Sequence, residues 1–219
     1  MSKKHGEWSK EAQNLTLIHG DILDPASFYI LPPSYSIVAN IPYYITGAIL
    51  EKFLEHGPRP SRMILLVQKE VAERIVARPP DGKKPDRKKL GDVKAHGKES
   101  ILSISVKAFG TPRIIANVPR GAFTPAPSVD SAILAIENIS GAHFRGDGSA
   151  ENKQLVGRFF DIVRSGFAHK RKFLIRNLEA VATGEKLAII WKKLELDEKV
   201  RAEDLAVEDW LRIRDTIIS

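Results

Sequence analysis

Short apolar runs alternate with amphipathic stretches along the first part of the chain. Residues 35–39 and 62–68 have the length and the apolar content of buried strands. Residues 46–54 place Ile49, Leu50, Phe53 and Leu54 at helical spacing after Thr46-Gly47, and residues 69–77 also have a helical pattern. Strand, helix, strand, helix in this order predicts a parallel α/β sheet.

The remaining pattern divides the chain into a polar tail and two domains. Residues 15–21 predict a further strand that ends in Asp21, and residues 113–118 and 132–136 predict two more, whereas residues 100–108 fit a helix or a strand. After a Gly- and Ser-containing break near residues 140–149, the pattern is helical to the end. We therefore expect a tail over 1–14, an α/β domain over 15–140 and a small all-α domain over 150–219.

Composition restricts the class of protein. The 219 residues are 43% hydrophobic and 28% charged, which is ordinary for a globular protein, and there is no cysteine. Disulfides and thiolate metal sites are excluded, and no metal is expected. No apolar run reaches the ~20 residues of a membrane span, and the first residues lack the apolar core of a signal peptide. We expect a cytoplasmic protein that does not bind membranes, with a monomer favoured.

The positive charge indicates a polyanionic partner. The formal net charge is +7, and nucleic acid is favoured over a membrane surface. Residues 78–98 hold eight Lys or Arg against three Asp, which fits a solvated loop and a phosphate-contacting arm equally well. Residues 158–178 form a predicted basic helical patch with a single acid, Asp161, and we predict that its cations contact RNA: Arg158, Arg164, Lys170, Arg171, Lys172 and Arg176.

The turn after residues 35–39 has the chemistry to hold a flat base. Its sequence is Asn40-Ile41-Pro42-Tyr43, at the carboxyl end of a predicted strand, where open α/β sheets bind ligands. The exocyclic amino nitrogen of a base is a poor nucleophile, because its lone pair is delocalised into the ring. The oxygen of Asn40 and the carbonyl of Ile41 could accept the two amino hydrogens, and Tyr43 could stack on the base. The alternative is an ordinary strand-to-helix turn.

Two other residues have a functional and a structural interpretation. Asp21 could accept a hydrogen bond from a nucleotide-like cofactor, or it could cap the turn toward Asp24-Pro25. Phe123 precedes Pro125 and Pro127, which favour an extended backbone that could hold its ring against the second face of a base. As the alternative, Phe123 fills a core position at the start of a loop.

Four stretches together resemble the ribosomal-RNA adenine dimethyltransferases that act on small-subunit RNA. They are residues 40–43, 68–74, 123–131 and 167–177, and the similarity extends from about Leu15 to the C-terminus. The resemblance implies that Asn40 and Tyr43 hold the target adenine and that Phe123 stacks on it. It also implies that Asp21 contacts the adenine of S-adenosylmethionine, with Asn40 beside the reactive end of the cofactor, and that the C-terminal helices dock on ribosomal RNA.

The sequence departs from this family at its N-terminus. Family members begin with a strand, a glycine-rich cofactor loop and a second strand, but no Gly-x-Gly-x-Gly occurs in these residues. We therefore expect a partial Rossmann-like methyltransferase sheet that lacks its first strands, and weak or no S-adenosylmethionine binding by this chain alone. Two functions stay open: methylation of adenine amino groups in small-subunit ribosomal RNA or its pre-ribosomal particle, and a non-catalytic RNA-binding assembly factor derived from such an enzyme.

Overall fold

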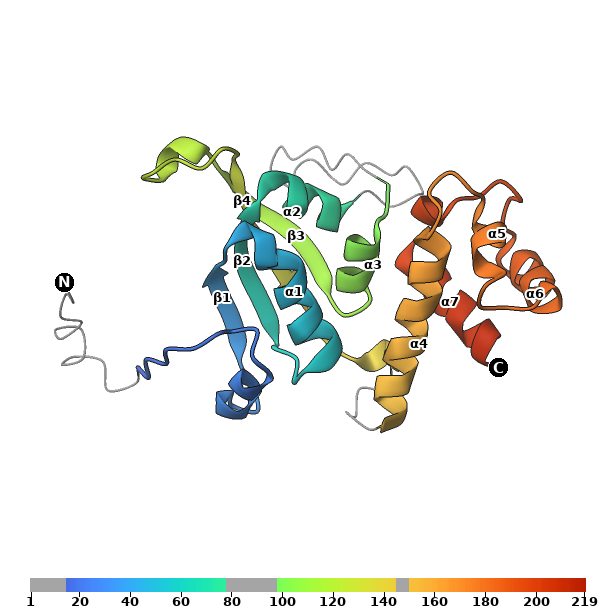
Figure 1. The fold of residues 1–219 in the computed structure, drawn as a ribbon, viewed down its shortest axis with the longest axis horizontal. Coiled ribbons are helices and arrows are strands. Elements are labelled where there is room, and N and C mark those ends of the chain that lie inside the picture. Colours follow the sequence, from blue (N-terminus) through green and yellow to red (C-terminus); the bar gives the residue numbers. More distant parts are fainter. Residues whose placement is uncertain (1–14, 78–97, 145–149) are drawn as a thin grey trace.

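The fold is a mixed four-stranded sheet followed by a group of helices. The computed structural model describes residues 15–77, 98–144 and 150–219. In the described residues the strands are β1 (Ser36–Asn40), β2 (Arg62–Gln68), β3 (Thr111–Val118) and β4 (Ser131–Glu137), in the order β1-β2-β4-β3 (Figure 1). All four correspond to predicted strands. The tail over 1–14 and nearly all of the basic segment 78–98 lie outside the described residues.

The parallel arrangement expected from the strand-helix-strand order is confirmed for β1 and β2, but it does not extend to the rest of the sheet. Only β1 and β2 pair in parallel, whereas β4 is antiparallel to both β2 and β3. The reason lies in the connections: a helix returns the chain from β1 to β2, but a loop without a crossover helix joins β3 directly to β4. Strands joined in that way run antiparallel, while parallel strands need a crossover.

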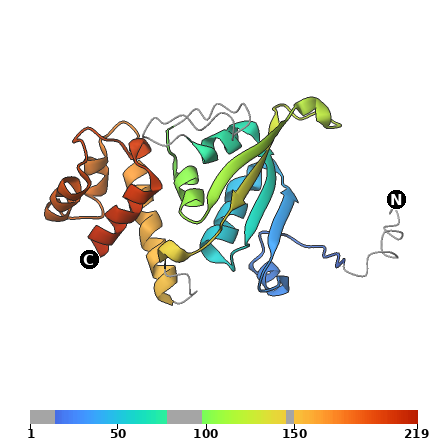
Figure 2. The same ribbon diagram turned by 180° about the vertical axis from the view of Figure 1, so that it is seen from behind.

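Three helices cover one face of the sheet (Figures 1 and 2). They are α1 (Thr46–Glu51), which continues as the π-helix η3 (Lys52–His56), α2 (Lys69–Val76) and α3 (Ile101–Lys107). Against them β2 buries every second side chain, and Ile49, Leu50, Phe53 and Leu54 are at most 2% exposed. The expected helix over 46–54 is confirmed, and the ambiguous segment 100–108 is a helix whose N-cap is Ser100.

The C-terminal part is helical and shares the hydrophobic core of the sheet. It contains α4 (Ala150–Phe167), α5 (Leu174–Leu178), α6 (Gly184–Leu194), the short 3-10 turn η6 (Ala202–Asp204) and α7 (Val207–Ile218). Phe160 of α4 stacks on Phe109, which follows α3, with ring centroids 6.2 Å apart. The buried cluster is therefore continuous from α1 to α7. No helix in the described ranges is long and apolar enough to cross a membrane.

The predicted strand over 15–21 is absent. Residues 15–19 have no regular structure and their apolar side chains are exposed, with Leu17 at 85%. A strand needs a neighbour for its backbone hydrogen bonds, and none of the four strands pairs with this segment. The apolar pattern is present, but its pairing partner is not among the described residues. The next regular element is the 3-10 helix η1 (Pro25–Ile30), which leads to β1.

Candidate functional site

The mixed sheet brings the ends of three strands and the start of a fourth to one edge. In the register, Asn40 at the end of β1 lies opposite Leu66, and Gln68 at the end of β2 lies opposite Ser131. Ser131 also pairs with Val118, the last residue of β3. Two of the motifs that the sequence singled out, 40–43 and 123–131, therefore meet at this edge, which we call the carboxyl edge.

A side-chain hydrogen bond joins these two motifs directly. The Tyr43 hydroxyl lies 2.6 Å from Oγ of Ser131, which is fully buried. Tyr43 begins the 3-10 turn η2 (Tyr43–Ile45), and its carbonyl accepts a hydrogen bond of 3.0 Å from Oγ1 of Thr46. Ile41 is buried beneath the turn at 6% exposure. The ring of Tyr43 is thus positioned by polar contacts at the carboxyl edge and remains half-buried.

Asn40 differs from Tyr43 because its side chain is available to bind a ligand. It is exposed at the end of β1, and its amide makes no hydrogen bond to any residue in the described part of the chain. The following residue, Ile41, is held in the core, and Pro42 restricts the turn to φ −56° and ψ 132°. An asparagine amide on a backbone fixed in this way can accept hydrogen bonds from a ligand without first breaking bonds of its own.

Phe123 lies on a loop that leaves the same edge. The loop connects β3 to β4, contains the turn η4 (Arg120–Ala122) and projects beyond the sheet (Figure 1). Oδ1 of Asp130 accepts a hydrogen bond of 3.0 Å from the backbone N–H of Arg120, which ties the two ends of the loop together. Phe123 is half-buried, and no ring contact joins it to Tyr43 within the described residues. Its stacking role stays a prediction.

Asp21 does not lie at the carboxyl edge. Its segment runs beside the opposite end of β1 (Figures 1 and 2). Oδ1 of Asp21 accepts a hydrogen bond of 2.8 Å from the backbone N–H of Leu23, as in a turn cap. The following turn is held by Lys52, whose ammonium donates to the carbonyl of Asp24. The structure therefore does not bring Asp21 and Asn40 together.

The predicted cations are all exposed, but they do not form one helical patch. Lys170, Arg171 and Lys172 lie in the turn between α4 and α5, so the prediction of a helix through 158–178 is wrong there. Asn177 explains why α4 ends: its Nδ2 donates to the carbonyl of Gly166 at 2.6 Å and to that of His169 at 3.2 Å. Side-chain bonds to terminal carbonyls replace the missing helical ones.

Other predicted cations have acidic neighbours. Arg176 donates to Glu179 at 2.8 Å, and Arg164 lies 3.9 Å from Glu55 and 3.8 Å from Asp161. Arg158 projects elsewhere, beside the end of α7, in a hollow that Ile217 and Ile218 also line. Of the six cations, only Lys170 and Lys172 share a cleft, together with Arg74 and Arg201, which the sequence reasoning missed.

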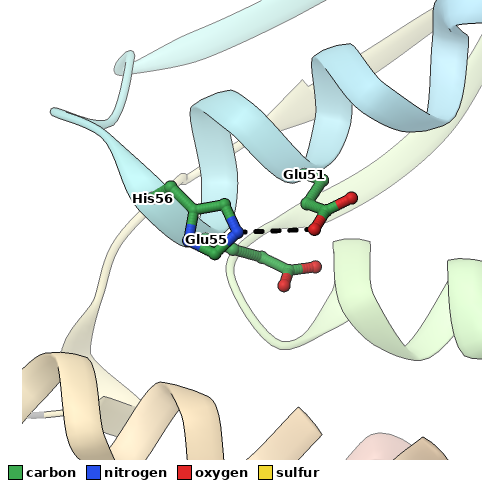
Figure 3. A group of neighbouring side chains, drawn as sticks. All are labelled: Glu51, Glu55 and His56. Carbon is green, nitrogen blue, oxygen red and sulfur yellow. Dashed lines mark hydrogen bonds and ion pairs between the residues drawn. The ribbon is translucent and has the colours of Figure 1, made fainter. Parts of the chain in front are cut away.

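The contact of Arg164 joins the helical part to a charged group at the end of α1 and on η3. The side chains of Glu51, Glu55 and His56 converge there, with Nε2 of His56 3.4 Å from Glu51 (Figure 3). Glu55 is the least accessible, with 7% of its side chain exposed. Burial, together with the charge of Glu51, raises the pKa of Glu55 to about 7 against the opposing effect of Arg164.

Comparison with known proteins first defines the fold class. The structure is similar to the crystal structure of the 23S rRNA methyltransferase ErmE, with a TM-score of 0.59 and 21% identity over 92% of this chain and 71% of that one. It is also similar to a dimethyladenosine transferase from Plasmodium falciparum, with a TM-score of 0.66 and 24% identity over the same shares. The fold is thus the Rossmann-like fold of rRNA methyltransferases.

The sequence defines the family. The family model "Ribosomal RNA adenine dimethylase" matches residues 1–219, and the chain belongs to this family. Relatives named "Ribosomal RNA small subunit methyltransferase A" occur in Dehalococcoides mccartyi strain BAV1, 37% identical over 91% of this chain, and in Nostoc punctiforme, 34% identical over 96%. The chain spans 62% of the Dehalococcoides protein and 68% of the Nostoc protein.

Proteins of this family use S-adenosylmethionine, and we tested whether the described residues fit it. The resemblance implies that such a site includes Asp21, at the adenine of the cofactor, and Asn40, beside its reactive end. Here Asp21 accepts a hydrogen bond from the backbone N–H of Leu23, and its segment runs beside the other end of β1 (Figures 1 and 2). The described residues therefore do not form a complete cofactor site.

Proposed function

We propose that this chain carries the adenine-binding part of a methyltransferase that acts on adenine amino groups in small-subunit ribosomal RNA. The observation that carries the proposal is the hydrogen bond between Tyr43 and Ser131, because it fixes two family motifs at one sheet edge beside the free amide of Asn40. Family membership supports the same reaction class.

In this proposal the amide oxygen of Asn40 accepts one hydrogen of the adenine amino group. The bond favours the pyramidal nitrogen, whose lone pair is no longer delocalised into the ring and is therefore more nucleophilic. No general base is needed at the start, since the amino group becomes acidic only after the methyl group has been added. The ring of Tyr43 stacks on one face of an adenine that has left its helix, and Phe123 covers the other.

The cations of the C-terminal part bring the RNA to this edge. We propose that Lys170, Arg171 and Lys172 contact phosphates, because these three exposed side chains lie in one turn and make no ion pair with any described residue. Phosphate contacts of this kind position an RNA without reading its sequence.

A methyl-incorporation assay tests the proposal. Undermethylated small-subunit particles are incubated with S-adenosylmethionine carrying a tritiated methyl group, and modified adenines are quantified after digestion. Calorimetry with the 219-residue chain measures its own affinity for the cofactor, which we expect to be weak because Asp21 is engaged with the backbone of Leu23 and the described residues do not complete a cofactor site.

Three outcomes of these experiments would change the interpretation. Micromolar cofactor affinity would show that other residues complete the site. Methyl groups found on a base other than adenine would overturn the proposed substrate. If the chain binds particles tightly but never methylates them, even when the cofactor is saturating, the alternative of an RNA-binding assembly factor is favoured.

A further inference from the structure

A cleft lies away from the carboxyl edge, where α3 meets the C-terminal helices. Its volume is about 330 Å³, which is at the lower end of the range for small-molecule pockets. Its wall includes the start of α3, the end of α4, the turn after α4 and η6. The cleft is fixed by backbone hydrogen bonds, because Glu99 N–H donates to the carbonyl of Glu203 at 3.0 Å and Leu174 N–H to that of Val200 at 2.8 Å.

Two buried acceptors in the wall of this cleft have no partner. Glu99 and Asn177 are each 5% exposed. One carboxylate oxygen of Glu99 is paired with Lys107, but Oε2 has no hydrogen-bond donor. Asn177 uses its Nδ2 to bind the end of α4, and its Oδ1 has no donor either. Both oxygens are enclosed by protein atoms. Because an unpaired buried acceptor is costly, a side-chain movement that brings either oxygen to a hydrogen-bond donor in the cleft is favourable.

The rim of the cleft carries the opposite charge. Lys170 and Lys172 line it, and neither has an acidic partner among the residues described. Arg74, which is paired with Glu70 at 2.7 Å, and Arg201 line it as well. The acid Glu203 also lines the cleft, where it is paired with Lys98. Ile101 adds an apolar surface that is 39% exposed. Cations outside, acceptors inside and an apolar wall match the three parts of a nucleotide: its phosphate, the amino edge of its base and the face of that base.

We propose that this cleft binds one unpaired nucleotide of the RNA, with a base that carries an exocyclic amino group. The amino group donates to Oε2 of Glu99 or Oδ1 of Asn177, Ile101 packs on the base, and the phosphate lies near Lys170 and Lys172. The inference rests on the proposed function only in taking RNA as the partner. It adds a second nucleotide site, at which the RNA is read and not modified.

Titration of the 219-residue chain with mononucleotides tests the site, followed by NMR at the methyl groups of Leu102, which lines the cleft, and Ile41, at the carboxyl edge. Cytidine and uridine monophosphate are the probes, because only cytosine has an amino group. We expect cytidine monophosphate to shift the Leu102 signals and uridine monophosphate to bind about tenfold more weakly, the effect of one hydrogen bond to a charged group.

Three variants locate the effect. Ile101→Glu places a negative charge at the base surface and should abolish the Leu102 shifts, whereas Ile189→Glu puts the same charge on α6, at a residue that is 55% exposed, and should not. Lys172→Glu should weaken the binding of both nucleotides and leave the ratio of their affinities unchanged. Unchanged signals of Ile41 and of the buried Ile114 show that each variant is folded.

The outcomes separate this site from the carboxyl edge. Three results would each overturn the proposal. They are equal affinities for the two nucleotides, Leu102 shifts that persist in Ile101→Glu, and the absence of any Leu102 shift. Asn40→Ala should not change the cytidine-to-uridine ratio. If that variant also left methyl transfer intact, the proposed function would fail while the nucleotide site stood.

Discussion

The carboxyl edge of the sheet and the cleft beside α3 both present an asparagine, but under opposite conditions. Asn40 is exposed and makes no hydrogen bond within the described residues, whereas Asn177 is 5% exposed and holds the end of α4 through two carbonyls. Replacement of Asn40 should leave folding intact and change chemistry. Replacement of Asn177 should break the end of a helix. Exposure and existing bonds, and not residue type, therefore decide which measurement reports on each site.

The largest effect is expected from Asn40→Ala. The rate constant of methyl transfer should fall about 100-fold in any form of the protein that turns over, because the lost hydrogen bond matters most as the amino nitrogen becomes pyramidal. RNA affinity and urea stability should stay near wild type. Single-turnover kinetics on small-subunit particles separates the chemical step from binding.

Asn117→Ala provides the matched control for Asn40→Ala, because Asn117 is also an exposed strand asparagine, on β3. It should behave as wild type. An Asn40→Ala protein with an unaltered chemical step would mean that residues 40–43 are only a strand-to-helix turn.

Removal of the cations in the α4–α5 turn should give the next largest effect. Replacement of Lys170, Arg171 and Lys172 with Ala should lower RNA affinity and flatten its dependence on salt. The slope of log K against log salt should fall by roughly 2, at about 0.7 per phosphate contact. Fluorescence anisotropy across a salt series measures the slope. Lys192 and Lys193, both exposed on α6, are the control pair, and an equal change in that pair would show that only net charge matters.

Gly166→Ala should destabilise the junction of α4 with the other C-terminal helices. A Cβ at Gly166 would lie 2.3 Å from Cη2 of Trp210, whose side chain is fully buried, and 3.1 Å from Leu174. Overpacking of this kind costs about 1–3 kcal/mol. Gly157 lies on the same helix, and a Cβ there would meet nothing within 4 Å, so Gly157→Ala should stabilise by about 0.5–1 kcal/mol. Urea unfolding measures the free energy of unfolding of each variant, which should fall for Gly166→Ala and rise for Gly157→Ala.

Local pattern was sufficient to predict most elements but not their partners. The strand β2 and the helices α1 and α2 follow from apolar spacing, which depends only on neighbouring residues. The antiparallel placement of β4 between β2 and β3 depends on pairing between distant segments. Residues 15–21 have the pattern of a strand and fail to form one, because pairing needs a second strand that the pattern does not supply.

The site shows the same division. Asn40, Tyr43 and the segment 123–131 were singled out by their chemistry, and the sheet places these motifs at one edge. Ser131 was quoted as part of a motif, but its bond to Tyr43 joins residues far apart in sequence. Arg74, Glu99 and Arg201 come from three separate segments. Only the tertiary fold brings them together, so no local signal could have indicated the cleft.

Removal of the Tyr43 hydroxyl should have a smaller effect than the substitutions above. Tyr43→Phe leaves the buried Oγ of Ser131 without its partner at 2.6 Å, which should cost about 1 kcal/mol. The stacking face of the ring is unchanged, so methyl transfer should fall only slightly. A double-mutant cycle with Ser131→Ala measures the coupling of the two groups through urea unfolding. Additive single effects would show that this bond does not fix the carboxyl edge.

The smallest effect concerns Glu55, which lies between the sheet helices and α4. Its pKa is raised to about 7 in the folded protein by burial and by Glu51, so the folded state keeps a proton that the unfolded chain loses near pH 4.5. Stability from this group is therefore complete below pH 4.5 and declines as the pH rises toward 7. With allowance for solvent screening, the decline should be about 1 kcal/mol.

Glu55→Gln should remove this part of the pH dependence, because the neutral amide does not titrate. Urea unfolding of both proteins at several pH values from 4.5 to 8 isolates the effect, since all other titrating groups are common to both and cancel in the difference. Glu51→Gln should remove only the part of the pH dependence that comes from the charge of Glu51. Parallel stability curves for wild type and Glu55→Gln would mean that Arg164, 3.9 Å away, keeps the carboxylate ionised at the junction, in which case Arg164 is a structural partner of η3 and not a contact for RNA.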